Sequence, residues 1–277
     1  LLIGDMNKTY YFMAGLPRSG STLLKSILNQ NPILHTEPVS PVMELMYWND
    51  HYFTDSEQYL GYPKPKSAHK VISSIIENYY FNVEKPVIID HCRAWSNNIE
   101  RIKTYITPEP KIICPVRNIT EVLTSFISMI RRNADQVSFI DQHLIENQLP
   151  ITDDNRCHYL MSKEGIVEQA LWAQSQAFIR GDQKHLLMVE YDDLIASPNE
   201  TMKKIYEFLE LDFYSHNFDQ IENTHREIDD QWYLKDMHYV RNKLEKKSQN
   251  PENILSDEIL TKYSNLEYWK YSNHKYF

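Results

Sequence analysis

The amino-acid sequence predicts an α/β fold in which helices cover both faces of a parallel sheet. Short segments rich in β-branched and aromatic residues alternate along the chain with segments in which apolar residues recur at helical spacing. The strand segments are almost continuously apolar, which is typical of strands that are buried on both faces. Because strand–helix–strand connections between parallel strands are right-handed in nearly all sheets, the predicted sheet has a defined hand.

Each element has its own sequence signal. The predicted strands are residues 10–14, 86–90, 111–116 and 186–190. Apolar residues at helical spacing predict one helix around 23–28 and another around 122–130. Two helix starts carry capping signals, namely Asn118 followed by Glu121, and Ser197 followed by Pro198 and Glu200.

The chain is predicted to be one domain, residues 1–277. It holds only six glycines among 277 residues and no Gly/Ser-rich or Pro-rich tract, so nothing marks a linker, and no internal repeat is found. The core is expected over about residues 10–210. After Leu211 the pattern becomes polar, aromatic and irregular, which predicts a helical or loop-rich tail, 211–277, packed over the core.

Charge and cysteine usage exclude several functional classes. The net charge of −9 argues against general nucleic-acid binding, so any anionic ligand must meet a local positive site. No apolar run is long enough to span a membrane, and the N-terminus lacks the zones of a signal peptide. Cys92, Cys114 and Cys157 fit neither a disulfide framework nor a zinc pattern. We expect a cytoplasmic protein with reduced thiols, Cys114 being buried in a strand.

The strongest motif is residues 15–22, Gly-Leu-Pro-Arg-Ser-Gly-Ser-Thr, which follow the first strand and open a helix. Such a loop turns backbone N–H groups toward one point at a helix N-terminus, where a phosphate binds. Ser21 stands where a nucleotide triphosphatase has its lysine, and the cation is Arg18 instead. This predicts a site for one terminal anionic group rather than a Mg-bound triphosphate, and ligand spacing suggests no metal site.

Residues 17–23, Pro-Arg-Ser-Gly-Ser-Thr-Leu, resemble the 5'-phosphosulfate-binding loop of the sulfotransferase superfamily. The helix and the following Asn31-Pro32 are similar to tyrosylprotein and bacterial sulfotransferases. The resemblance implies a kinase-like P-loop fold of three layers. It also implies the donor 3'-phosphoadenosine 5'-phosphosulfate (PAPS), the product adenosine 3',5'-bisphosphate (PAP), and donor contacts from Arg18, Ser19, Gly20, Ser21 and Thr22.

Two further matches extend the resemblance to about residue 210. Arg117, at the end of the third strand, precedes Ser125 by eight residues, the spacing with which sulfotransferases hold the 3'-phosphate of the donor. Taken alone, an arginine at a strand end is more often a salt-bridge partner, and it is the Arg18 loop that favours the phosphate role. Residues 189–194, Val-Glu-Tyr-Asp-Asp-Leu, resemble the Tyr-Glu-Asp-Leu segment that packs near the donor's adenosine in sulfotransferases. The resemblance implies an adenosine contact for Tyr191, and a tyrosine that fills core space is the alternative. The Arg-Lys-Gly segment of cytosolic sulfotransferases is absent, and Arg241 is our candidate for its replacement.

The resemblance implies sulfuryl transfer by in-line displacement, with Arg18 stabilising the leaving phosphate and a His or Glu as general base. His91, after the second strand, and Glu37, after the loop helix, both fit the position of that base. Asp90, Glu44 and His35 remain further alternatives. Arg93 is expected to add charge to the sulfonate pocket.

The acceptor stays open among small molecules, glycans and peptides that offer a hydroxyl or an amine. Two rival functions remain. A P-loop kinase acting on a small metabolite fits the general fold but is opposed by Ser21 at the lysine position. A non-catalytic nucleotide-binding protein would bind the donor without turnover.

Overall fold

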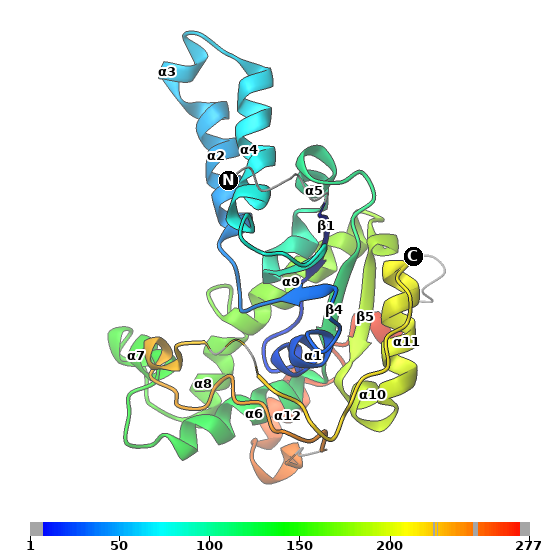
Figure 1. Ribbon diagram of the computed structural model, residues 1–277. Coiled ribbons are helices and arrows are strands. Elements are labelled where there is room, and N and C mark those ends of the chain that lie inside the picture. The colour runs from blue at the N-terminus through cyan, green and yellow to red at the C-terminus, as the bar shows by residue number, and fades with distance from the viewer. Residues whose placement is uncertain (1–7, 224, 226, 246–248, 272–277) are drawn as a thin grey trace.

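The computed structural model describes residues 8–223, 225, 227–245 and 249–271. Within these residues a five-stranded parallel sheet has the order β2-β3-β1-β4-β5 (Figure 1). Its strands are β1 (Thr9–Met13), β2 (Leu34–Thr36), β3 (Val87–His91), β4 (Ile112–Val116) and β5 (Leu186–Glu190). The four predicted strands are therefore confirmed to within one residue at each end. Edge strand β2 was not predicted, because three residues are too few to show alternation.

Helices flank the sheet (Figure 1). The α-helices are α1 (Ser21–Leu28), α2 (Val42–Asp55), α3 (Glu57–Leu60), α4 (Pro65–Tyr79), α5 (Ile99–Tyr105), α6 (Ile119–Arg132), α7 (Phe139–Glu146), α8 (Asp153–Leu160), α9 (Ile166–Ile179), α10 (Tyr191–Ala196), α11 (Pro198–Leu209), α12 (Asp257–Tyr263) and α13 (Tyr268–Tyr271). The short 3-10 helices are η1 (Arg93–Asn97), η2 (Gln183–His185), η3 (Asp229–Trp232) and η4 (Pro251–Asn253).

The two faces of the sheet bury separate cores, as alternation along a strand requires. Phe12 and Ile112 belong to the core formed with α6 and α9, whereas their neighbours Met13 and Ile113 belong to the core formed with α1 and α11. The result is the predicted α/β arrangement of helix, sheet and helix. Helices α2 and α4 lie side by side and project from the body of the molecule (Figure 1).

The starts of α6 and α11 carry the capping residues that the sequence predicted. Asn118 caps α6, because its side chain accepts hydrogen bonds from the backbone N–H groups of Thr120 and Glu121. Ser197 precedes α11 as predicted, but its side chain forms no capping hydrogen bond. That part of the prediction is wrong, and Pro198 at the first helical turn fixes the backbone instead.

Between Leu211 and η4 the described residues are irregular apart from η3, and this segment returns across the sheet ends (Figure 1). Its buried side chains Ile221 and Val240 join one core, and Leu234, Met237 and Ile259 join the other. The three cysteines are free and buried, with Cys114 in β4 as predicted. No helix in the described part of the chain is long and apolar enough to cross a membrane.

Candidate functional site

A cavity of about 360 Å³ opens at the carboxyl ends of the central strands. Four strand ends contribute to its lining: the loop after β1, His91 at the end of β3, Arg117 after β4 and Tyr191 after β5. Tail residues 236–241 line the cavity on a further side. Ligands of open α/β sheets bind in this position, because helix N-termini and loops converge there.

The loop between β1 and α1 is held in a strained conformation. Arg18 has a φ of 60° and Gly20 a φ of 87°, both in the left-handed region that favours glycine. A Cβ atom on Gly20 would lie 2.7 Å from the Tyr191 ring, so only glycine fits at this position. The Ser19 hydroxyl donates to the Leu16 carbonyl at 2.6 Å and is thus committed to the loop itself. Ser21 and Thr22 line the cavity, as expected.

Arg18 is the centre of the cationic side of the cavity. Its Nε donates to the Ser125 hydroxyl at 3.2 Å, and its Nη1 donates to the Met237 carbonyl of the tail. Burial, together with the nearby charges of Arg117 and Arg132, lowers the pKa of Arg18 to about 10. In the sequence, Arg18 belongs to one motif and Arg117 and Ser125 to another, and the structure brings the three together at one cavity.

Arg117 forms a salt bridge and also lines the cavity. Its Nε pairs with Glu121 at 2.8 Å, so it is a salt-bridge partner. Its guanidinium also lies 4.4 Å from the centre of the Tyr191 ring and lines the cavity. The Tyr191 face holds the arginine in place through a cation–π contact. Tyr191 opens α10 and so stands at the mouth of the site.

Basic side chains outnumber acidic ones in the cavity lining. The basic residues are Arg18, Arg93, Arg117, Arg132, Arg241 and Lys243, and the acidic residues are Glu227, Asp236 and Glu245. Holding several like charges in a partly desolvated cavity is unfavourable unless an anion compensates them. In a chain with a net charge of −9, this cavity is the local positive site that an anionic ligand requires. Arg241, the candidate from the tail, is one of these lining residues.

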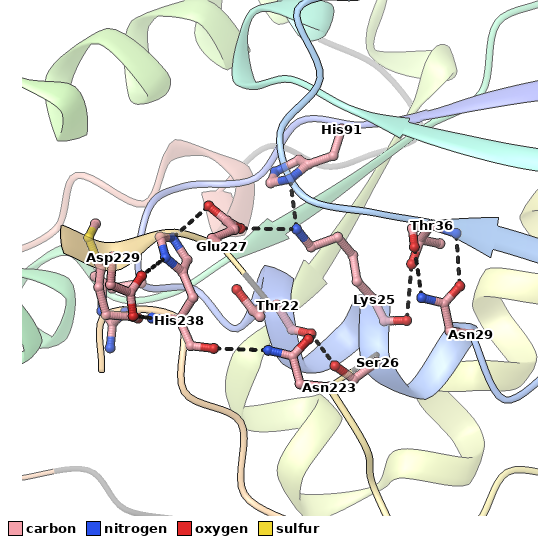
Figure 2. A network of polar contacts seen from close by, with 12 residues as sticks. Thr22, Lys25, Ser26, Asn29, Thr36, His91, Asn223, Glu227, Asp229 and His238 are labelled. Atoms are coloured by element: carbon pink, nitrogen blue, oxygen red, sulfur yellow. Dashed lines mark hydrogen bonds and ion pairs between the residues drawn. The ribbon is translucent and has the colours of Figure 1, made fainter. Parts of the chain in front are cut away.

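Behind the phosphate loop, Lys25 of α1 joins a buried polar network (Figure 2). Its Nζ lies 3.2 Å from Nδ1 of His91 and 3.6 Å from Glu227. Glu227 in turn lies 3.1 Å from Nε2 of His238, whose Nδ1 lies 2.6 Å from Asp229. Burial lowers the pKa of Lys25 to about 8, although Glu227 opposes this shift. Burial and the charges of Lys25, Arg93 and His238 lower the pKa of His91 well below its usual value.

The other candidate bases lie in different surroundings. Asp90 is fully buried and accepts hydrogen bonds from Ser40, Tyr80 and Trp95 at 2.5, 2.7 and 2.6 Å, which is a structural arrangement. Glu37 lies 3.2 Å from His35, and neither residue lines the cavity.

Glu44 lines a second cavity, next to the first. Of the five residues considered as the base, His91 alone lines the loop cavity.

Sequence reasoning missed Lys25, Glu227 and Arg132. A lysine among the apolar residues of a helix indicates that an acidic side chain elsewhere compensates its charge. The partner of Lys25, Glu227, lies 202 positions later in an irregular segment. No pattern in the sequence joins the two. In the described residues, no group of three or more His, Cys, Asp or Glu side chains is arranged to hold a metal ion.

The fold and the loop site define an α/β protein of the P-loop type. The family model described as "Sulfotransferase family" matches residues 11–215. The chain therefore belongs to the sulfotransferase family. The match ends before the tail residues that close the cavity.

Individual relatives are distant. A protein named cytosolic sulfotransferase 10 of Arabidopsis thaliana is 20% identical over 219 residues, which are 74% of this chain and 57% of that protein. The chain thus matches little more than half of that relative's length.

Two solved structures share the fold. The sulfotransferase domain from the curacin biosynthetic pathway has a TM-score of 0.56 at 14% identity, covering 92% of this chain and 97% of that one. A mouse sulfotransferase complexed with PAP has a TM-score of 0.50 at 16% identity, covering 98% of this chain and 86% of that one.

Proposed function

We propose that this protein transfers a sulfuryl group from PAPS to a hydroxyl or amine of a small-molecule acceptor. The observation that carries the proposal is the convergence of Arg18, Ser125 and Arg117 on one cavity beside the phosphate loop. The 5'- and 3'-phosphates of the donor are separated and need two anion sites. In this proposal the loop holds the 5'-phosphate, and Arg117 and Ser125 hold the 3'-phosphate. Membership of the sulfotransferase family supports this donor.

In the proposed reaction the acceptor oxygen attacks sulfur in line with the leaving group. An O–S bond forms to the acceptor, the bond from sulfur to the 5'-phosphate oxygen of PAP breaks, and the acceptor proton passes to a base. Negative charge develops on the leaving phosphate, so preorganised donors there lower the barrier. Arg18 and the N–H groups of the loop supply those donors.

For the base we propose His91, because it lines the cavity and Glu37 does not. Its Nδ1 faces Lys25, and this contact controls the tautomer. A charged Lys25 ammonium donates to Nδ1, so the proton of neutral His91 stays on Nε2. Nε2 then has no lone pair with which to take the proton of the acceptor. Neutral Lys25 can instead accept from Nδ1–H, which frees the Nε2 lone pair. The proposed base is therefore the His91–Lys25 pair in the state in which Lys25 is deprotonated.

Calorimetric titration with PAP and with AMP, in buffer containing a metal chelator, tests the proposal. PAP should bind at least about tenfold more tightly than AMP, because charge-assisted hydrogen bonds to the 3'-phosphate are worth about 1.5–3 kcal/mol. Equal affinities would remove the assignment of the 3'-phosphate site. A strict Mg²⁺ requirement would favour the P-loop kinase, and binding of PAP with no turnover of PAPS would favour the non-catalytic protein.

A further inference from the structure

A chain of charged side chains leads from the proposed base into the tail (Figure 2). Nζ of Lys25 lies 3.2 Å from Nδ1 of His91 and 3.6 Å from Oε1 of Glu227. The other carboxylate oxygen of Glu227, Oε2, lies 3.1 Å from Nε2 of His238. Glu227 is therefore shared between the helix that follows the phosphate loop and a histidine of the tail, so a change of charge in the tail acts directly on Lys25.

Asp229 fixes the ring of His238. Its Oδ1 lies 2.6 Å from Nδ1 of the ring, and its Oδ2 accepts a hydrogen bond from the backbone N–H of His238 at 3.3 Å. A carboxylate only accepts, so Nδ1 carries a proton in this contact. A neutral imidazole has one N–H, and its Nε2 would then present a lone pair to Glu227.

The contact between Nε2 of His238 and Glu227 therefore needs a second proton. Two lone pairs that face each other at 3.1 Å repel, and one proton between them turns the repulsion into a hydrogen bond. The proton belongs either to an imidazolium beside a carboxylate or to a carboxylic acid beside a neutral ring. In both forms these two groups together carry no net charge, so His238 weakens the attraction between Glu227 and the Lys25 ammonium.

We propose that Glu227 and His238 are positioning residues that together set the charge of Lys25 and, through it, the tautomer of His91. This inference rests on the proposed function, in which a neutral Lys25 frees Nε2 of His91 to take the acceptor proton. Glu227 favours the ammonium and His238 moderates that effect, so the tail holds Lys25 near the point at which it changes charge. The pKa of Lys25, which burial lowers and Glu227 raises, is about 8, in agreement with this balance.

Charged groups on other elements also face this chain of side chains. They are Arg93 and Glu37 toward Lys25, Arg93 toward Glu227, His91 toward His238, and Arg18 toward Asp229. Substitutions at Glu227 and His238 leave all of these groups in place. An effect on Lys25 that passes through the tail can therefore be separated from theirs.

Titration of Lys25 by nuclear magnetic resonance tests the inference without donor or acceptor. The protein carries lysine that is isotope-labelled at Cε, and the Lys25 signal is identified by its absence in Lys25→Met. We expect the titration midpoint of Lys25 to fall by at least about one pH unit in Glu227→Gln, since an opposite charge within about 4–6 Å shifts a pKa by about 1–3. In His238→Asn the midpoint should rise, because Glu227 is then an uncompensated carboxylate.

Two further variants exclude a general loosening of the tail. Glu222→Gln changes an exposed tail carboxylate outside the cavity lining and should leave the midpoint at the wild-type value. Loosening would hydrate Lys25 and raise its midpoint, so a fall in Glu227→Gln cannot arise in this way. The double variant Glu227→Gln/His238→Asn should show the low midpoint of Glu227→Gln, because His238 acts through Glu227.

The tautomer of His91 is followed in each variant by the nitrogen shifts of its ring in isotope-labelled protein. Nδ1–H should replace Nε2–H at the pH at which Lys25 loses its proton. An unchanged midpoint in either single variant would overturn the inference, and so would a high midpoint in the double variant or a His91 tautomer that does not follow Lys25. Failure of PAP to bind would instead remove the proposed function and leave these titrations as they are, so the two failures are distinguishable.

Discussion

Lys25 Nζ lies 3.2 Å from His91 Nδ1, and both side chains are buried. The contact joins a residue of the phosphate-loop helix to the last residue of β3. Lys25 also faces Glu227, with Arg93 and Glu37 nearby, and His91 also faces Arg93 and His238. The protonation of the Lys25–His91 pair therefore depends on charged groups of both the core and the tail.

This pair predicts an unusual pH dependence. Since burial holds the pKa of His91 well below its usual value, the imidazole is neutral at pH 7 and its own titration does not limit activity. Because Lys25 loses its proton with a pKa of about 8, kcat/KM should rise with pH around that value. A pH–rate profile with matched ionic strength measures this. A rise centred near the ordinary histidine value of about 6.5 would contradict the role of Lys25.

Substitutions at Lys25 separate tautomer control from simple structural support. Lys25→Met removes the competing donor, so the rise in kcat/KM should move to lower pH by at least about one unit, which corresponds to 1.36 kcal/mol. Lys25→Arg keeps a permanent charge, and its activity should stay low even at high pH. PAP affinity should change little in either variant. Identical pH profiles in Lys25→Met and Lys25→Arg would reject tautomer control.

Arg117→Ala should reduce the preference of the protein for PAP over AMP. The guanidinium is held by Glu121 and Tyr191, so it is preorganised for an anion, and losing a charge-assisted hydrogen bond costs about 1.5–3 kcal/mol. We expect PAP affinity to fall about tenfold or more and AMP affinity to change little. Calorimetry on both ligands measures the ratio. An equal loss for both would mean that Arg117 contacts the part that they share.

Arg18→Ala should lower kcat more than it lowers PAP affinity, because charge on the leaving phosphate grows toward the transition state. The substitution also removes the contact to Met237, so the comparison variant is Ser125→Ala, which breaks the Nε contact of Arg18, keeps the Met237 contact and removes one proposed donor to the 3'-phosphate. Initial rates over a range of PAPS concentrations separate kcat from KM. A rise in KM with kcat unchanged would make Arg18 a ground-state anchor.

Asp90→Ala should destabilise the fold rather than change the chemistry. The carboxylate accepts from Ser40, Tyr80 and Trp95 in a fully buried position, and each donor left unsatisfied costs about 1–3 kcal/mol. Thermal unfolding should show a Tm lower by about 6 °C or more, at about 2–4 °C per kcal/mol for a chain of this size. Asp55→Ala, whose side chain is 72% exposed, is the control. A Tm equal to that of the control would exclude this structural role.

The sequence predicted the sheet well because its strands carry continuous apolar runs that do not depend on distant partners. β2 escaped notice because its pairing with β3, rather than its own pattern, makes Leu34–Thr36 a strand. The loop residues and Arg117 were likewise found from local motifs. The Lys25–Glu227 contact and the Arg18 contact with Met237 were not, because each joins the core to an irregular segment about two hundred residues away.

Three hydrogen bonds attach the tail to the body of the protein through main-chain atoms of the tail. Arg18 donates to the Met237 carbonyl, and Asn133 exchanges hydrogen bonds with the carbonyl and the N–H of Lys235. A hydrogen bond to the main chain does not depend on the side chain of the residue that provides it, so these three attachments stay in place when neighbouring side chains vary. Variation at the exposed lining residues Asp236 and Tyr239 can then change which molecules enter without altering the phosphate loop, and these two positions are the place to begin directed evolution.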